Sequence, residues 1–172
     1  TGHDGRSTID ADQVADECRE IVTAIVAFAE DKGLQISGVC FDSFASSLLL
    51  VDKQKRALTP CATYADSRCA AYVAELKQKT DVGAYHQRTG VRVHTSYHPA
   101  RFLWIQDQFP DLWEKTWRVM TIGEYVYLKL AGIEGLATST GAWSGIVNAH
   151  TGELDTETVS YTHLRAHETR HD

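Results

Sequence analysis

The chain has 172 residues, of which 43% are hydrophobic and 23% are charged, enough for one globular domain with a real core. The formal net charge is −6 and no basic run occurs, which argues against a nucleic-acid-binding surface. No apolar run approaches the roughly 20 residues needed to cross a bilayer, and no signal peptide is visible. The four cysteines form no Cys-x-x-Cys pair, which favours a reduced, cytoplasmic protein.

The first predicted element is a helix that is capped by Thr8 or Asp10 and ended by Gly33. Its apolar residues recur at spacings of three and four, which predicts one buried face. They are Val14, Cys18, Ile21, Val22, Ile25 and Phe28. Every charged residue lies off this stripe, so we expect the helix to serve packing.

Two short apolar runs, Val39–Phe41 and Leu48–Val51, predict buried strands. Residues 42–47 between them are small or polar, and a polar turn at 52–56 follows. A core strand rarely contains an Asp and three serines unless its end opens onto a wet space, such as a ligand cleft. On the residues alone, an ordinary strand–loop–strand corner is an equally good interpretation.

The rest of the chain is predicted to be mainly helical. Asp66 or Ser67 is expected to cap a helix through Leu76, because an Asp at a helix start accepts free backbone amides. His94 and His98 are interpreted as hydrogen-bonded loop histidines rather than metal ligands, since no carboxylate or Cys stands at ligand spacing. The later elements are a connector at 81–92, a helix at 101–108 with Pro99 in its first turn, a helical turn from Phe109 through Trp113 and Trp117, a strand at 119–122, and a helix at 123–130 ended by Gly132.

Four segments resemble the N-terminal domain of the FGGY family of carbohydrate kinases, and the gluconokinase-like branch is the most similar. Residues 42–48 read Asp-Ser-Phe-Ala-Ser-Ser-Leu, similar to a sugar-contacting segment, and residues 64–68 read Tyr-Ala-Asp-Ser-Arg, similar to Trp-x-Asp-x-Arg. Residues 89–101 and 139–148 resemble two later motifs, with Arg101 where the family has Lys. Ala45 and Ser46 stand where the family has an aromatic residue or Met and a His, which leaves the sugar open.

The resemblance implies an incomplete α/β domain of the ribonuclease H-like (actin-like ATPase) fold, with a mixed sheet flanked by helices, over residues 1–158. It implies ATP-dependent phosphorylation of a small-molecule sugar or sugar acid, with Mg²⁺, by a longer parent. A planar ring suits the apolar face of a sugar, and a carboxylate accepts hydrogen bonds from its hydroxyls. The substrate-binding residues carried over are Phe44, Ala45, Ser46, Tyr64, Asp66 and Arg68, and Asp66 can bind sugar and cap a helix at once.

The expected catalytic Asp and the phosphate-approaching Asp-x-Gly-Thr hairpin are not found in this sequence. We therefore expect an inactive sugar-binding half with exposed sheet edge, apolar surface and poor solubility. The alternatives are a non-catalytic sugar-binding or regulatory module and, with less support, another member of the superfold. Residues 159–172 back-translate naturally to a transposase library adaptor, so they are expected to be a non-native tail rather than a histidine metal site.

Overall fold

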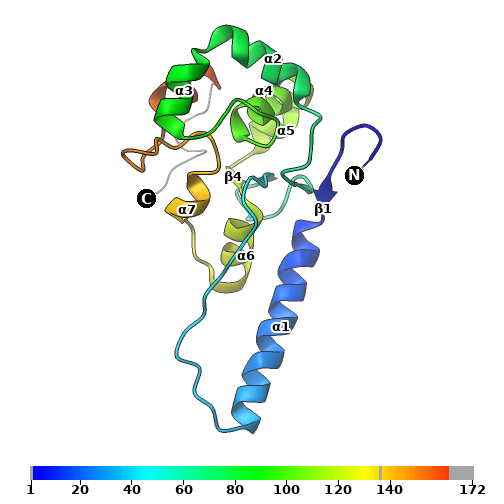
Figure 1. The fold of residues 1–172 in the computed structure, drawn as a ribbon. Coiled ribbons are helices and arrows are strands. Elements are labelled where there is room, and N and C mark those ends of the chain that lie inside the picture. Colours follow the sequence, from blue (N-terminus) through cyan, green and yellow to red (C-terminus); the bar gives the residue numbers. More distant parts are fainter. Residues whose placement is uncertain (1, 136, 163–172) are drawn as a thin grey trace.

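The fold is α/β, as expected: short strands lie in the core and helices pack on both sides of them (Figure 1). The computed structural model describes residues 2–135 and 137–162. Strand β1 pairs antiparallel with β3, and β2 pairs antiparallel with β4. The elements in chain order are β1 (Thr8–Ile9), α1 (Ala11–Asp31), β2 (Leu49–Val51), β3 (Cys61–Ala62), α2 (Ala70–Lys79), α3 (Val82–Thr89), α4 (His98–Gln108), α5 (Pro110–Lys115), β4 (Arg118–Met120), α6 (Ile122–Ala131), α7 (Thr138–Gly141) and α8 (Thr156–Tyr161).

Strand β2 is buried on both faces, which confirms the strand predicted from its continuous apolar run. Alternate residues of a strand point to opposite sides, so Leu49 and Val51 pack with α1 and α6. Leu48 and Leu50 pack on the other side, with Phe102 of α4 and its neighbours. The turn at 52–56 is confirmed, because the Asp52 N–H donates to the Arg56 carbonyl at 3.0 Å. The strand is therefore the layer between two helical cores.

Helix α1 begins and ends as predicted, with the Asp10 side chain accepting from the Gln13 N–H and Gly33 following the last turn. The prediction of a buried apolar face is wrong for its second half, where Phe28 is 59% exposed and Ile21 and Ile25 are also exposed. The cause is length: α1 has 21 residues and its packing partner α6 has 10. At about 1.5 Å per residue, α6 covers only half of α1. The spacing of the apolar residues predicts that the helix has an apolar face, but it does not predict whether another element covers that face.

The predicted strand at Val39–Phe41 is wrong, because the segment that follows α1 is extended but unpaired (Figure 1). Within the described chain, no backbone–backbone hydrogen bond involves residues 35–42. Val39 is 65% exposed, whereas Phe41 packs its ring against Tyr127 of α6 at a centroid distance of 4.2 Å. A strand needs a hydrogen-bonding partner, and an apolar run alone does not supply one. Exposed apolar surface is confirmed here and on α1.

Three helix boundaries differ from the predictions. Helix α2 begins after Cys69 without a side-chain cap, so the cap predicted for Asp66 or Ser67 is wrong. The predicted connector contains helix α3, capped by the Asp81 side chain and ended by Gly90 in the left-handed region. Helix α4 begins three residues earlier than expected, with Pro99 in its first turn as predicted. Each of these helices is short, so few residues reveal its period.

The chain between α5 and α6 follows the predicted order with shifted boundaries. Helix α5 ends before Trp117, whose N–H donates to the Val51 carbonyl at 2.8 Å, so the helical turn predicted through Trp117 is wrong there. Strand β4 begins one residue before the predicted start and ends two before the predicted end. Helix α6 carries a capping box, in which Thr121 and Glu124 satisfy each other's backbone amides, and Gly132 ends it as predicted.

The C-terminal boundary at residue 158 stays a prediction. Residues 159–162 of the expected tail lie in α8 and at its end, where the Thr162 carbonyl accepts from Gln106 Nε2 at 2.8 Å. Residues 163–172 fall outside the described part of the chain.

Among the described helices, none combines the length and apolar character that crossing a membrane requires. The four cysteines are free thiols, and burial raises the pKa of Cys61 to about 11.

Candidate functional site

Four segments meet beside the start of β2, and we call them the four-loop surface: residues 44–47, 63–66, 94–96 and 143. The loop before β2 is held by hydrogen bonds to other parts of the chain. Ser46 adopts a positive φ of 60°, a conformation that costs energy for a non-glycine residue and needs support from its surroundings. Its hydroxyl donates to the Trp143 carbonyl at 3.2 Å. The Ser47 hydroxyl accepts from the Ile122 N–H at 3.0 Å, which joins the loop to the start of α6.

Arg101 of α4 holds three of these loops together. Its guanidinium is buried and donates to the carbonyls of Ser46 at 2.8 Å, Thr63 at 2.6 Å and Thr95 at 2.8 Å. These are charge-assisted hydrogen bonds, which are roughly twice as strong as neutral ones. Burial lowers the pKa of Arg101, and within the described residues no carboxylate lies at ion-pair distance from it. The Arg101 cation therefore has a structural role, since its hydrogen bonds connect three loops.

His98 lies beneath the same loop. It is buried at the start of α4, and its Nε2 donates to the Ser47 carbonyl at 3.1 Å. Burial and the nearby Arg101 cation lower the pKa of His98 to about 3, so the imidazole is neutral. His94 is an exposed loop residue that bonds Ser96 through Nδ1 at 3.1 Å. Both histidines are hydrogen-bonded as predicted, but only His94 lies in a loop, because His98 is the first residue of helix α4. The described residues contain no group of three potential metal ligands.

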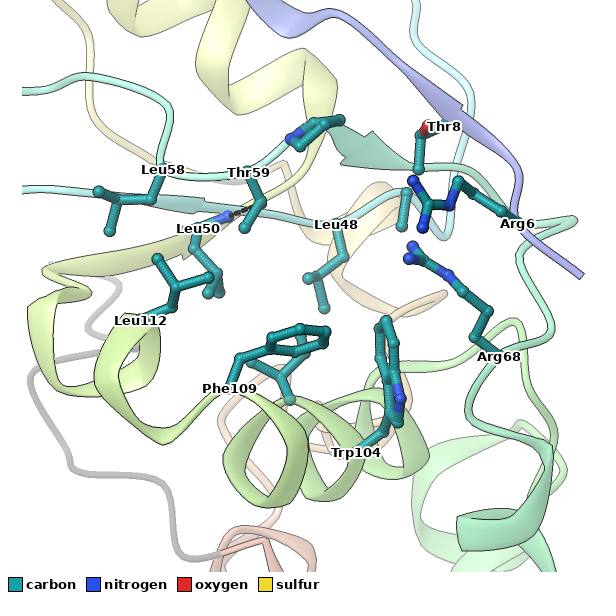
Figure 2. A pocket seen from close by; sticks show the side chains of 13 residues that line it. Arg6, Thr8, Leu48, Leu50, Leu58, Thr59, Arg68, Trp104, Phe109 and Leu112 are labelled. Atoms are coloured by element: carbon teal, nitrogen blue, oxygen red, sulfur yellow. Dashed lines mark hydrogen bonds between the residues drawn. The ribbon is translucent and has the colours of Figure 1, made fainter. Parts of the chain in front are cut away.

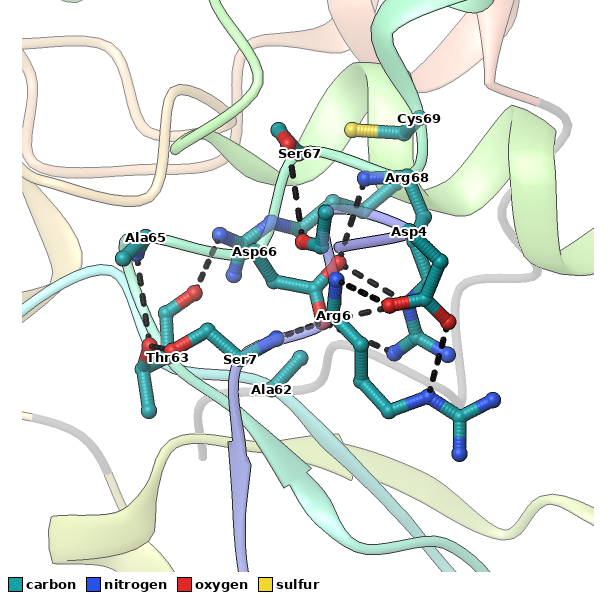
Figure 3. Close-up of polar contacts among 12 residues, drawn as sticks. Asp4, Arg6, Ser7, Ala62, Thr63, Ala65, Asp66, Ser67, Arg68 and Cys69 are labelled. Carbon is teal, nitrogen blue, oxygen red and sulfur yellow. Dashed lines mark hydrogen bonds and ion pairs between the residues drawn. The ribbon is translucent and has the colours of Figure 1, made fainter. Parts of the chain in front are cut away.

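The Asp66 carboxylate is buried and committed to neighbours within the chain (Figure 3). It accepts from the Ser7 N–H at 3.1 Å and from Arg68 through Nε at 3.0 Å and Nη2 at 2.8 Å. Burial alone would raise the pKa of Asp66, but the hydrogen bonds from Arg68 and from the Ser7 backbone lower it overall. Asp66 is thus an anion that anchors the strand β1 side of the fold to the loop before α2.

Aromatic side chains project from the four-loop surface into solvent. Tyr64 is 63% exposed, Trp143 is 55% exposed and Phe44 is 45% exposed. The backbone beneath Tyr64 is fixed, because its carbonyl accepts from the Ser96 hydroxyl at 2.9 Å. Ala45 is partly buried and contributes little side-chain bulk. Exposed rings on a hydrogen-bonded support are the kind of surface that binds a ligand with an apolar face.

The structure thus brings most of the predicted substrate-binding residues to one region but gives them different environments. Phe44 and Tyr64 point outward, Ser46 bonds a neighbouring loop, and Asp66 and Arg68 bond each other. Whether each contacts a sugar stays a prediction. Trp143 was missed as a candidate because it falls at a variable position of its motif, and sequence spacing gives no signal that it meets Ser46.

A separate cavity of about 280 Å³ lies between β2 and helices α4 and α5 (Figure 2). Its wall is mostly aliphatic and aromatic, and Arg6 and Arg68 lie at one end. The Arg68 guanidinium lies 4.6 Å from the centroid of the Trp104 ring, a cation–π distance. The lining residues are Arg6, Thr8, Leu48, Leu50, Leu58, Thr59, Pro60, Ala62, Arg68, Trp104, Ile105, Phe109 and Leu112.

The fold is that of actin-like ATPase-type sugar kinases. The xylulose kinase from Rhodospirillum rubrum superposes with a TM-score of 0.93 at 22% identity, over 99% of this chain and 35% of that one. The model of the FGGY family of carbohydrate kinases, N-terminal domain, matches residues 1–168. The chain therefore belongs to the FGGY family of carbohydrate kinases.

Two curated relatives agree with this assignment. The gluconokinase of Bacillus subtilis (strain 168) is 25% identical over 125 residues, which are 73% of this chain and 24% of the relative. The rhamnulokinase of Yersinia pestis (strain Pestoides F) is 23% identical over 164 residues, which are 95% of this chain and 33% of the relative. The chain spans a quarter to a third of the length of these relatives.

Proposed function

We propose that this chain provides part of the sugar-binding surface of a carbohydrate kinase, and that the longer parent transfers the γ-phosphoryl group of ATP to a sugar or sugar acid in the cytoplasm. The observation that carries the proposal is the four-loop surface, where Tyr64 and Phe44 project from a backbone held by Arg101. Rigid support for a binding group lowers the entropy lost when the ligand binds.

In this proposal, ATP and Mg²⁺ are bound by the longer parent protein and not by this chain alone. The described residues hold no cluster of three His, Cys, Asp or Glu side chains. Asp66 is paired with Arg68 and is not free to act as a base. We therefore assign binding and orientation of the sugar to this chain and no chemical step.

A second candidate is a non-catalytic sugar-binding or regulatory module. It is favoured by Ser46, whose hydroxyl is used in the contact with Trp143 instead of projecting from the surface. The two candidates share the sugar site and differ in whether the parent turns over ATP.

Titration of the chain with gluconate, xylulose and rhamnulose, followed by ¹H–¹⁵N NMR, tests the shared part. We expect shifts around Tyr64 and loss of binding in Tyr64→Ala, with unchanged binding in Phe28→Ala, which removes an equally exposed ring from α1. Binding unaffected by Tyr64→Ala, or no binding of any sugar, would contradict the proposal. Sugar-dependent ADP release by this chain alone would contradict the assignment of an inactive half.

A further inference from the structure

The cavity beside β2 is large for a domain of this size. Protein cores leave few voids larger than a single water molecule. This cavity has a volume of about 280 Å³, which corresponds to roughly nine water molecules at about 30 Å³ each. Leu48, Leu50 and Ile105 line it and are buried. Trp104 and Phe109 also line it, with their rings in edge contact at a centroid distance of 5.4 Å. The wall therefore suits an apolar molecule of about ten non-hydrogen atoms.

Two cations lie at one end of the cavity. Figure 2 shows the guanidinium groups of Arg6 and Arg68 pointing toward each other, next to the Trp104 ring. Arg68 donates to the Asp66 carboxylate through Nε at 3.0 Å and Nη2 at 2.8 Å. Arg6 contacts Asp4 through Nε at 3.5 Å. Among the described residues, the Nη1 atom of Arg68 and both Nη atoms of Arg6 have no hydrogen-bonding partner.

The groups at this end of the cavity can bind a single negative charge. Two guanidinium groups that face each other repel, and an anion between them removes the repulsion. The Thr8 hydroxyl lies beside them and takes part in no hydrogen bond within residues 2–135 and 137–162. Asp4 and Asp66 already offset much of the charge of the two arginines, so a monoanion fits better than a dianion such as a phosphate ester. A carboxylate can accept parallel N–H bonds from a guanidinium.

We propose that this cavity binds a small carboxylic acid with an apolar body, of about ten non-hydrogen atoms in all. The carboxylate accepts hydrogen bonds from Arg6, Arg68 and the Thr8 hydroxyl, and the hydrocarbon chain packs against the apolar wall. The proposal is independent of sugar binding, because no residue of the four-loop surface lines the cavity. Of the predicted sugar-binding residues, Arg68 alone lines it.

The test uses octanoate, which matches this size and charge, in a ¹H–¹⁵N NMR titration of the 172-residue chain. Octan-1-ol retains the apolar body without the charge, and acetate retains the charge without the body. We expect octanoate to shift the amide resonances of Arg6, Leu50 and Ile105, and to bind about tenfold more tightly than either of the other two probes. Equal binding of octanoate and octan-1-ol would overturn the proposal, as would shifts centred on the exposed apolar residues of α1.

Variants test the two ends of the cavity separately. Arg6→Gln removes a charge from an exposed side chain and should lower octanoate affinity about fivefold. Arg19→Gln is the matched control on α1, where Arg19 is likewise exposed and paired with an aspartate, and it should bind as the unaltered chain does. Leu112→Trp adds bulk to the partly buried wall and should abolish binding, with folding checked by circular dichroism.

The outcomes are distinguishable from those of the sugar titration. If Arg6→Gln and Arg19→Gln bind octanoate equally well, or if octanoate does not bind the unaltered chain, the cavity is not a carboxylate site. Neither result bears on sugar binding, which is followed at Tyr64 in the four-loop surface. Octanoate affinity that Tyr64→Ala leaves unchanged would support two separate sites, and a loss of affinity in that variant would contradict them.

Discussion

Because the imidazole of His98 is buried and neutral, we predict that the free energy of unfolding depends on pH. Its pKa is lowered from an ordinary 6.5 to about 3, mainly by burial and then by the Arg101 cation. A histidine with a lowered folded-state pKa contributes its full stability above the unfolded pKa and loses it as the pH falls toward the folded pKa. Between pH 7 and pH 5, this linkage removes about 2 kcal/mol from the free energy of unfolding.

The unaltered chain alone does not reveal this effect, because Glu124 acts in the opposite direction. Burial raises the pKa of Glu124 from 4.5 to about 7. A carboxyl with a raised folded-state pKa stabilises the fold as the pH falls toward the unfolded pKa, here by up to about 2 kcal/mol between pH 7 and pH 5. The two contributions nearly cancel, so the difference between a variant and the unaltered chain is the informative quantity.

His98→Gln keeps an amide that can donate to the Ser47 carbonyl and removes the titration. Urea unfolding followed by circular dichroism at pH 7, 6 and 5 gives the free energy of unfolding for both proteins. Relative to the unaltered chain, His98→Gln is expected to gain about 2 kcal/mol between pH 7 and pH 5. A difference that stays constant over this range would refute a buried neutral His98.

Three further predictions concern other residues. Glu124→Gln should show the reverse trend in the same urea experiment, gaining about 1–2 kcal/mol over the unaltered chain as the pH rises from 5 to 7; a flat difference would contradict it. Arg101→Ala should cost about 3–5 kcal/mol of unfolding free energy because it leaves three carbonyls without their buried donor, and Arg101→Lys should cost about half as much. Ile25→Lys combined with Phe28→Lys should reduce self-association in sedimentation velocity while changing stability by less than about 0.5 kcal/mol; an unchanged degree of association would show that the exposed face of α1 is not responsible.

Sequence patterns predicted the elements that carry their own signals. The cap at Asp10, the run Leu48–Val51 and the glycines that end α1 and α6 are local features, and the structure agrees with each. The unpaired state of Val39–Phe41 was not predictable from the apolar run, because pairing depends on a partner elsewhere in the chain.

The candidate site was predictable only in part, for the same physical reason. Tyr64 and Phe44 were identified by motif resemblance and are exposed as a binding surface requires. The hydrogen bond from the Ser7 N–H to the Asp66 carboxylate joins residues 59 positions apart, and no local sequence pattern predicts such a contact. Trp143 likewise acquires its place through Ser46, 97 positions away.

The contacts of Arg101 also bear on the order in which the chain folds. The guanidinium joins carbonyls that are 55, 38 and 6 positions away in sequence, so the longest of these contacts must wait for the ends of a large loop to meet. Loop closure costs entropy before the contact returns any stability, and non-local pairings therefore slow folding. We therefore expect the four-loop surface to form only after β2 and α4 have come together, and later than the individual helices.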